Sequence, residues 1–174
     1  MRTVLSSIES EYRRYKRLGD ESIRQLDAEA LVRQPPGDGN SVAAIVWHIA
    51  GNLRSRFTDF LTTDGEKPWR DRESEFALRA VSADDVRGKW EEGWDVLFKA
   101  LAALTDDELP RTVVIRGQDL SVLDALQRSV THTSYHVGQI VFLARSLRGK
   151  WWEWLTIPPG QSDAYNQNPR GKKP

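Results

Sequence analysis

The sequence predicts an all-α fold, a four-helix bundle with long connections and an irregular C-terminal tail. First, apolar residues recur at spacings of three and four over four long stretches, which places them on one face of a helix. Second, segments rich in proline, glycine and polar residues separate these stretches, as PPGDGN does at residues 35–40. Third, 174 residues can enclose one sizeable core, so we expect a single domain over residues 1–174.

The first two predicted helices lie in the N-terminal part of the chain. The first covers residues 4 to about 26, where Leu5, Ile8 and Tyr12 begin an apolar stripe. The second covers residues 42 to about 62, after a loop in which Asn40 or Ser41 can cap its start. Its apolar side consists of Val42, Ile45, Ile49, Leu53 and Phe60.

A long polar connection leads to the other two predicted helices. Ser82 with Asp85 resembles a capping box that opens the third helix, which runs to about residue 104. Residues 111–122, RTVVIRGQDLSV, contain β-branched side chains before Gly117 and predict a short hairpin. The fourth helix covers residues 122 to about 147, opened by Ser121 and ended near Gly149. The residues after it form the irregular tail.

Composition and charge exclude several classes of protein. Lysine plus arginine equals aspartate plus glutamate at 25 each, which argues against a nucleic-acid binder. The absence of cysteine excludes disulfides, thiolate ligands and a cysteine nucleophile. No apolar run is long enough to span a membrane, and the first 18 residues are too charged for a signal peptide. We therefore expect a cytoplasmic protein with no membrane partner.

The chain contains three histidines, and their spacing predicts a metal site. His132 and His136 stand four residues apart in the fourth predicted helix, so both face the same side. His48 lies in the second predicted helix and can supply a third ligand. Any one of them alone is more often an ordinary polar residue. Together they fit a catalytic site with an open fourth position, because closed structural zinc sites usually take four protein ligands.

Two amide side chains are candidates to orient these histidines. Asn52 follows His48 by four residues and Gln139 follows His136 by three, so each can point towards the metal side of its helix. Imidazoles bound to a metal usually donate their other N–H to an oxygen acceptor. For Gln139, a contact elsewhere on its helix is an equal alternative.

Other polar and aromatic residues near the histidines have more ordinary interpretations. For Arg54 and Arg56 we favour surface ion pairs over binding of a substrate anion. For Tyr135 we favour a place in the core over a role as proton donor. The tail tryptophans are expected to pack on the helices rather than to wall a pocket; they are Trp151, Trp152 and Trp154.

The sequence offers no side-chain nucleophile with an activating base. Thr133 follows His132, so the glutamate of the H-E-x-x-H protease motif is missing. If all three histidines bind metal, none remains to pair with a serine. The catalytic residues therefore stay unknown. The metal is the strongest activator available, for a thiol or a water molecule that enters from outside.

Three segments resemble the DinB/YfiT-like superfamily, and in particular an uncharacterised bacterial branch of it. They are VWHIAGNLRSRFTDFLTTDGEKPWRDR, HTSYHVGQIVFLAR and the closing W-x-x-L-x-I-P-P-G, so the resemblance covers essentially the whole chain. The most specific part is H-x-x-x-H-x-G-Q-I at residues 132–140, with W-H-I-A-G-N as its partner motif. The resemblance implies a four-helix bundle that holds a divalent metal, commonly Zn²⁺ or Ni²⁺. The ligands that it implies are His48, His132 and His136.

The same resemblance implies a class of reaction. Members of the superfamily include transferases and isomerases that use low-molecular-weight thiols such as mycothiol or bacillithiol. Other members are described as metal-dependent hydrolases. We therefore expect a metal-dependent transferase that takes a small-molecule substrate and a thiol cosubstrate. The alternatives are a metal-dependent hydrolase of a small substrate and a non-catalytic metal-binding protein.

Oligomeric state is a further expectation. Seven tryptophans give more aromatic surface than a core of this size readily hides, and exposed apolar patches usually meet a partner. Members of the resembled superfamily often pair through two of their helices. We therefore expect a homodimer, with Trp90 and Trp94 as candidates for part of its surface.

Overall fold

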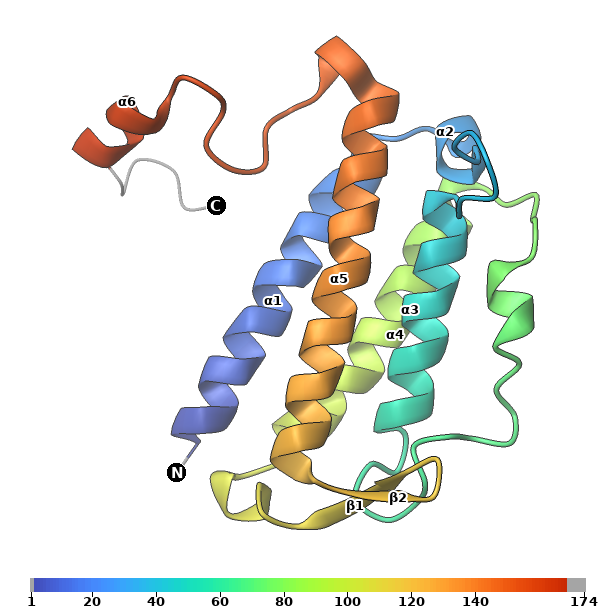
Figure 1. The fold of residues 1–174 in the computed structure, drawn as a ribbon, viewed down its shortest axis with the longest axis vertical. Helices are drawn as coiled ribbons and strands as arrows, with labels where there is room; N and C mark the ends of the chain where they lie inside the picture. The colour runs from blue at the N-terminus through green and yellow to red at the C-terminus, as the bar shows by residue number, and fades with distance from the viewer. Residues whose placement is uncertain (1, 169–174) are drawn as a thin grey trace.

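The computed structural model describes residues 2–168 and is mostly helical. Four long helices lie side by side in this part of the chain (Figure 1). They are α1 (Thr3–Arg24), α3 (Val42–Phe57), α4 (Ala83–Ala102) and α5 (Val122–Arg148). The shorter elements are α2 (Ala28–Val32), η1 (Glu73–Phe76), η2 (Asp106–Glu108), β1 (Thr112–Ile115), β2 (Gln118–Ser121), η3 (Gly149–Trp151) and α6 (Ser162–Gln167). The all-α class is confirmed.

Side-chain caps begin three of the long helices. The Ser41 hydroxyl accepts a hydrogen bond from Ala44 N at 3.2 Å, so Ser41 rather than Asn40 caps α3. At the start of α4, the predicted capping box of Ser82 and Asp85 is confirmed by reciprocal bonds of 3.1 and 2.8 Å. Ser121 caps α5 as predicted. These caps satisfy backbone N–H groups that have no partner within the helix.

The predicted boundaries differ from the structure at the end of α3. This helix ends at Phe57 rather than near residue 62, because Thr58 is extended and Asp59 has a φ of 49°. The Asp59 carbonyl oxygen then accepts the backbone N–H groups of Thr62 and Thr63 in a tight turn. Phe60 still reaches the core, as its place in the apolar pattern predicts. The short helices α2 and α6 are not part of the sequence prediction.

Trp90 and Trp94 lie in the core, so the prediction that they form a dimer surface is wrong. Their side chains are 2% and 0% exposed and meet edge to face at 5.2 Å between ring centroids. Gly19 of α1 admits Trp90, because a Cβ at Gly19 would lie 2.3 Å from the indole ring. Trp90 Nε1 also donates to Asp20 at 2.6 Å. The homodimer itself stays a prediction, which light scattering at micromolar concentration tests.

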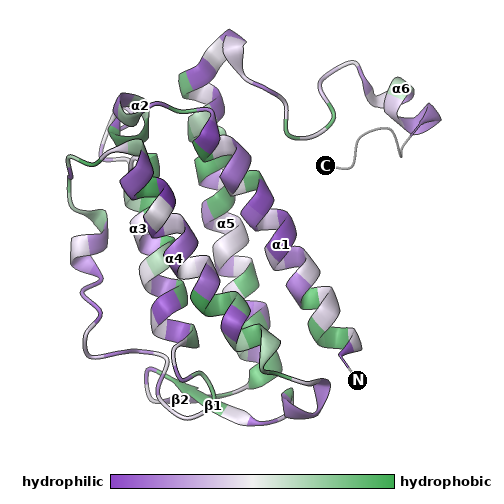
Figure 2. Cartoon of the chain, turned by 180° about the vertical axis from the view of Figure 1, so that it is seen from behind, coloured by the Kyte–Doolittle hydropathy of each residue, from purple (hydrophilic) through white to green (hydrophobic). Residues whose placement is uncertain are grey.

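Each long helix carries an apolar and a polar side. Figure 2 shows hydrophobic and hydrophilic residues alternating along these helices, as expected when one face packs inward. The largest fully buried side chains come from several of them and include Tyr12, Leu53, Trp94, Leu126 and Ile140. Burial of these faces fixes the relative positions of α3 and α5, the helices that carry the three histidines.

The predicted hairpin is confirmed as the antiparallel pair β1–β2. Its turn lies at Arg116 and Gly117, which have φ values of 55° and 68°. The Asp64 carboxylate accepts both of their backbone N–H groups at 2.8 Å, and Gly65 N donates to the Val114 carbonyl oxygen. The loop after α3 is therefore tied to the hairpin, and this places Arg116 beside α3.

After η3 the tail first contacts the end of α1, where Glu153 and Gln25 exchange two hydrogen bonds, and then leads away from the long helices (Figure 1). Trp152 is buried, as expected for a packed tail residue, whereas Trp151 and Trp154 are exposed. The Arg145 guanidinium lies over the Trp154 ring at 4.4 Å, a contact on the surface rather than in the core. Within the described residues, no helix is long and apolar enough to cross a membrane.

Candidate metal centre

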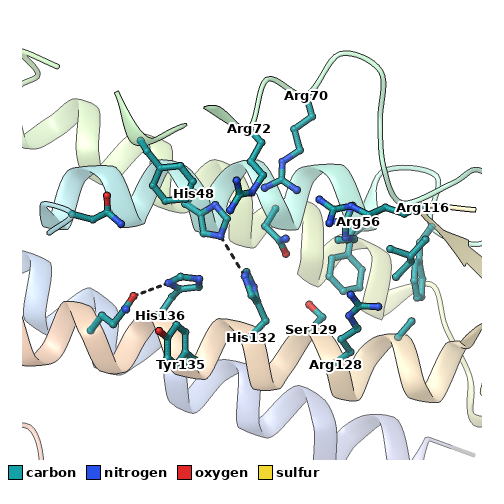
Figure 3. A pocket seen from close by; sticks show the side chains of 18 residues that line it. His48, Arg56, Arg70, Arg72, Arg116, Arg128, Ser129, His132, Tyr135 and His136 are labelled. Carbon is teal, nitrogen blue, oxygen red and sulfur yellow. Dashed lines mark hydrogen bonds between the residues drawn. The ribbon is translucent and has the colours of Figure 1, made fainter. Parts of the chain in front are cut away.

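The three histidines come together between α3 and α5 (Figure 3). His48 is 4% exposed, while His132 and His136 are half-buried. One ring nitrogen from each lies within 4.8 Å of the others, so the cluster could hold a metal ion. The Nε2 atoms of His48 and His132 are 3.3 Å apart. This is close to the roughly 3.4 Å that separates two nitrogen ligands of one tetrahedral zinc ion at about 2.05 Å.

The protonation state of the cluster also suits a metal. Burial lowers the pKa of His132 to about 4, and the neighbouring His136 and His48 act in the same direction. Burial also lowers the pKa of His136. Both imidazoles are therefore neutral at pH 7, and neutral imidazole is the form that coordinates metal ions.

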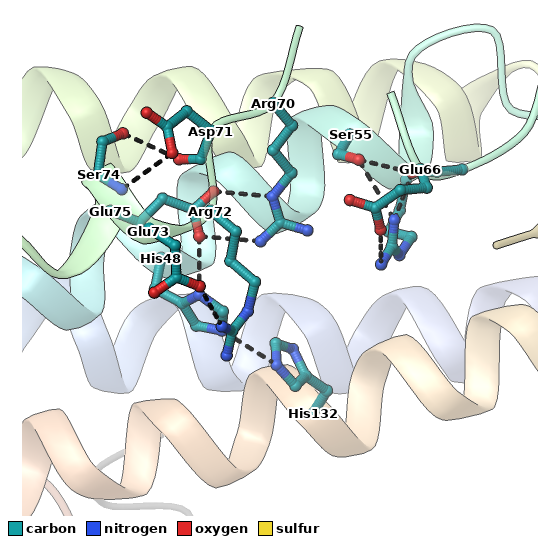
Figure 4. Close-up of polar contacts among 12 residues, drawn as sticks. His48, Ser55, Glu66, Arg70, Asp71, Arg72, Glu73, Ser74, Glu75 and His132 are labelled. Atoms are coloured by element: carbon teal, nitrogen blue, oxygen red, sulfur yellow. Dashed lines mark hydrogen bonds and ion pairs between the residues drawn. The ribbon is translucent and has the colours of Figure 1, made fainter. Parts of the chain in front are cut away.

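Glu75 holds His48 from behind (Figure 4). His48 Nδ1 lies 2.8 Å from Glu75 Oε2, and Arg70 donates to both carboxylate oxygens at 2.7 and 2.9 Å. Burial raises the pKa of Glu75, but the hydrogen bonds from His48 and Arg70 outweigh it and hold this pKa below its usual value. Because an ionised carboxylate only accepts, Nδ1 carries the proton and Nε2 keeps its lone pair towards the cluster.

The position of Glu75 depends on a glycine one turn along α3 from His48. A Cβ at Gly51 would lie 2.1 Å from Glu75 Oε1, so only glycine allows this approach. The next residue, Phe76, stacks on the His48 ring with centroids 4.7 Å apart. The η1 segment thus covers His48 and fixes its ring orientation.

Glu75 and Arg70 were not predicted as site residues. Both lie in the long polar connection, and Glu75 is 27 residues from His48, so no helical spacing relates them. The available signal was Gly51 inside an otherwise regular helical pattern. A glycine there often marks a close approach of another segment.

The two amide candidates take different places. His136 Nδ1 lies 2.7 Å from Gln139 Oε1, so Nδ1–H donates a hydrogen bond to Gln139 and Nε2 is directed towards the cluster. This is the first of the two alternatives for Gln139. Asn52 lines the same cavity, but its side chain makes no hydrogen bond to a described residue. It does not orient a histidine in this structure.

A cavity of about 400 Å³ opens in front of the histidines. Tyr135 lines it and is 64% exposed, so the expectation of a core tyrosine is wrong: its position on α5 turns outward. Arg56 also lines it, although it pairs with Glu66 as well. Arg54 forms the expected surface ion pair, with Glu92 at 3.0 Å. None of the three tail tryptophans lines the cavity.

The walls of the cavity are aromatic and cationic. Phe57, Phe60 and Phe76 supply aromatic surface. Five arginines line it, and they are Arg56, Arg70, Arg72, Arg116 and Arg128. No aspartate or glutamate of the described chain is among its lining residues. The nearest carboxylate to the histidines, Glu75, is occupied by His48 and Arg70 and is no free base.

Comparison with known protein families matches residues 1–161 to the family described as "Protein of unknown function (DUF1572)". The matched region contains the three histidines, Glu75 and all five arginines of the cavity. No curated protein matches the chain.

Proposed function

The chain belongs to the DUF1572 family, and we propose that it binds one divalent metal ion, Zn²⁺ or Ni²⁺, through His48, His132 and His136. The observation that carries this proposal is the convergence of three ring nitrogens beside an open cavity. Two of these rings have an oxygen acceptor on Nδ1, which leaves Nε2 to bind the ion. The fourth position would face the cavity and accept a ligand from solution.

We further infer that the architecture is a four-helix bundle of the DinB/YfiT-like type. One histidine comes from α3 and two, four residues apart, come from α5, which is the arrangement that the resemblance of the motifs implies. The long connections between the helices carry η1 and the hairpin, and both border the cavity through Phe76, Ile115 and Arg116.

We propose that the reaction is a transfer to a small thiol. A divalent ion at this site would lower the pKa of a thiol and hold it as the thiolate. A free thiol has a pKa near 8.5, so this activation needs little help from a protein base. A hydrolase needs a group that moves protons between water and the leaving group. The lining residues include no carboxylate for that role, which favours the thiol.

The residues around the cavity have distinct parts in this proposal. Arg70 and Glu75 fix the tautomer and orientation of His48, and Gln139 does the same for His136. Phe57, Phe60 and Phe76 supply apolar surface that would limit access of water to a bound substrate. The thiol would release its proton to solvent as it binds. The thiolate sulfur would then attack an electrophilic carbon of the second substrate, forming a C–S bond as the leaving group departs with its electron pair.

The first test is elemental analysis of protein purified without a histidine tag. About one divalent ion per chain is expected. His132→Ala and His136→Ala should each lose it while keeping the helical circular dichroism signal. Gln127→Ala, an exposed change on the same helix, is the matched control and should keep the ion. Full occupancy in the double histidine variant would refute the metal site.

The second test concerns turnover. Conjugation of small thiols to 1-chloro-2,4-dinitrobenzene is followed with metal-loaded, metal-depleted and reconstituted protein. Loss on depletion and recovery on reconstitution support the transferase. Metal-dependent cleavage of an ester or amide without thiol conjugation would make the protein a hydrolase. A bound ion with no turnover on either panel would leave a metal-binding protein.

A further inference from the structure

The cavity beside the histidines carries more positive charge than its neighbours neutralise. Arg56 and Arg116 share one carboxylate oxygen, Glu66 Oε2, at 3.1 and 2.7 Å. Arg70 pairs with Glu75, which His48 also contacts, and Arg72 pairs with Glu73. Arg128 is exposed and forms no ion pair with a described residue. Three carboxylates thus pair directly with four of the five guanidinium groups, before any divalent ion is counted.

Three of these arginines gather at one end of the cavity. Arg128 precedes His132 by four residues on α5, which is about 6 Å along the helix axis. Arg56 lies two turns beyond His48 on α3, and the hairpin turn supplies Arg116. Figure 3 shows their side chains grouped on the same side of the histidines. The triad of Arg56, Arg116 and Arg128 comes from three separate segments that the fold brings together.

Holding like charges together has an electrostatic cost, which Arg56 offsets only in part by donating to the Gly65 carbonyl oxygen and to Glu66. Burial lowers the pKa of Arg56, Glu66 raises it, and the charges of Arg70 and Arg116 lower it further. Unneutralised guanidinium groups beside one another repel, and the repulsion grows where water is partly excluded. An anion bound among them would remove this repulsion and satisfy their N–H donors in pairs.

The space between the arginine triad and the histidines is also polar. Ser129 stands between Arg128 and His132 on α5 and is 7% exposed. Its neighbour there is the Tyr12 hydroxyl, which donates to the Leu126 carbonyl oxygen and keeps its own oxygen as an acceptor for Ser129. The wall between the arginine triad and the histidines thus contains a hydroxyl as well as charged groups.

We propose that the arginine triad binds a carboxylate or phosphate group of the substrate, while the reactive end of the same molecule reaches the histidine cluster. The proposal rests on the proposed function for the reactive end alone, because the triad and its charge exist without a metal. It names the substrate class: a small anionic molecule, in which the anionic group and the reacting atom are separated by about one helical turn. The anion belongs either to the thiol or to its electrophilic partner.

The experiment measures thiol binding to protein loaded with Co²⁺, in which a coordinated thiolate gives a charge-transfer absorption band. The protein is titrated separately with mercaptosuccinate, which is anionic, and with 2-mercaptoethanol, which is neutral, and the two affinities are compared. Mercaptosuccinate is expected to bind at least about ten-fold more tightly, because charge-assisted hydrogen bonds are the strong ones. Arg128→Gln and Arg116→Gln should each remove most of the preference for mercaptosuccinate. The affinity for 2-mercaptoethanol, which has no anionic group, should stay the same. Arg145→Gln, exposed on the same helix as Arg128, is the control and should change neither.

A second arm locates the anion. Conjugation rates are compared for 4-chloro-3,5-dinitrobenzoate and 1-chloro-2,4-dinitrobenzene. A preference for the anionic thiol assigns the charged group to the thiol, and a preference for the anionic electrophile alone assigns it to the partner. If thiols bind, but charged and neutral compounds have equal affinities and equal conjugation rates, the anion subsite is refuted. The transferase proposal would not be affected by that result.

A third measurement separates this proposal from the proposed function. If no thiol produces the absorption band, calorimetry of metal-free protein with inorganic phosphate and succinate decides the matter. Binding that weakens in Arg128→Gln but not in Arg145→Gln would support the anion subsite despite the failure of the thiol proposal. No binding to the wild type would overturn it.

Discussion

Gly51 lies against Glu75 so closely that a Cβ on Gly51 would fall 2.1 Å from Glu75 Oε1. This contact joins α3 to the η1 segment at the level of His48. Because Glu75 also holds His48 Nδ1, the missing side chain at Gly51 determines where an imidazole of the candidate metal centre points.

We therefore expect Gly51→Ala to displace Glu75. Overpacking of this kind should lower the free energy of unfolding by about 1–3 kcal/mol. Loss of the carboxylate behind His48 should weaken metal binding about ten- to hundred-fold. Urea unfolding and competition with a coloured chelator measure the two effects.

Gly88→Ala is the matched control for this variant. Gly88 also lies inside a long helix, but a Cβ there would meet nothing within 4 Å. Alanine at this position should raise the free energy of unfolding by up to about 1 kcal/mol and leave metal affinity unchanged. Equal metal affinity in the two variants would show that the contact between Gly51 and Glu75 does not support the site.

Glu75→Gln tests the carboxylate itself. The amide keeps the shape but not the charge that Arg70 and His48 share. We expect the folded variant to bind metal about ten-fold more weakly, or worse, because a neutral amide oxygen is a weaker acceptor for His48 than a carboxylate and leaves Arg70 without its charged partner. Chelator competition measures the affinity, with circular dichroism to verify folding.

Glu73→Gln provides the comparison for Glu75→Gln. Glu73 belongs to the same η1 segment, is exposed and pairs with Arg72. Surface ion pairs contribute little, so this variant should behave like the wild type. If Glu73→Gln and Glu75→Gln lose affinity equally, the effect comes from the general charge of the segment and not from the contact with His48.

The metal candidates could be predicted from the sequence, but their surroundings could not. His132 and His136 are four residues apart on one helix, a local relationship that helical geometry converts directly into proximity. His48 required the amphipathic pattern of a second helix, and Gln139 required only a spacing of three. The predicted starts of α3, α4 and α5 depend on serine caps, which are equally local.

Glu75, Arg70 and the arginine triad depend on how connections fold over the helices. Arg116 reaches the cavity because Asp64 holds the hairpin turn, a contact across more than fifty residues. Trp90 likewise proved buried because Gly19 of α1 leaves room for it. No regular spacing in the sequence relates the residues of either contact. Such contacts can be identified only once the positions of the loops and of the opposing helices are known.

Acid should destabilise the metal-free protein between about pH 6.5 and pH 4. The folded-state pKa of His132 is lowered to about 4 by burial, whereas in the unfolded chain it lies near 6.5. In this window the unfolded state binds a proton that the folded state does not, so stability falls as pH falls. The lowered pKa of His136 acts in the same direction.

Urea unfolding at pH 7 and pH 4.5 measures this effect. Since His132 is partly exposed, solvent screening limits its share to about 2 kcal/mol or less. His132→Gln should lose less stability between the two pH values than the wild type does. An identical loss in both proteins would mean that His132 titrates normally and is not the source of the acid sensitivity.

Removal of the metal should lower the thermal stability of the protein. An ion that binds only the folded state stabilises it by about 2.7 kcal/mol when its free concentration is a hundred times the Kd. For a chain of this length, that corresponds to a shift in Tm of about 5–10 °C. Differential scanning calorimetry with and without a chelator measures the shift.

His136→Ala should show a small shift or none, because two histidines with an open site bind the ion too weakly. Gln127→Ala on the same helix should keep the full shift. If His136→Ala were stabilised by added metal as strongly as the wild type, the ion would bind elsewhere, and the cavity between α3 and α5 would lose its proposed activator.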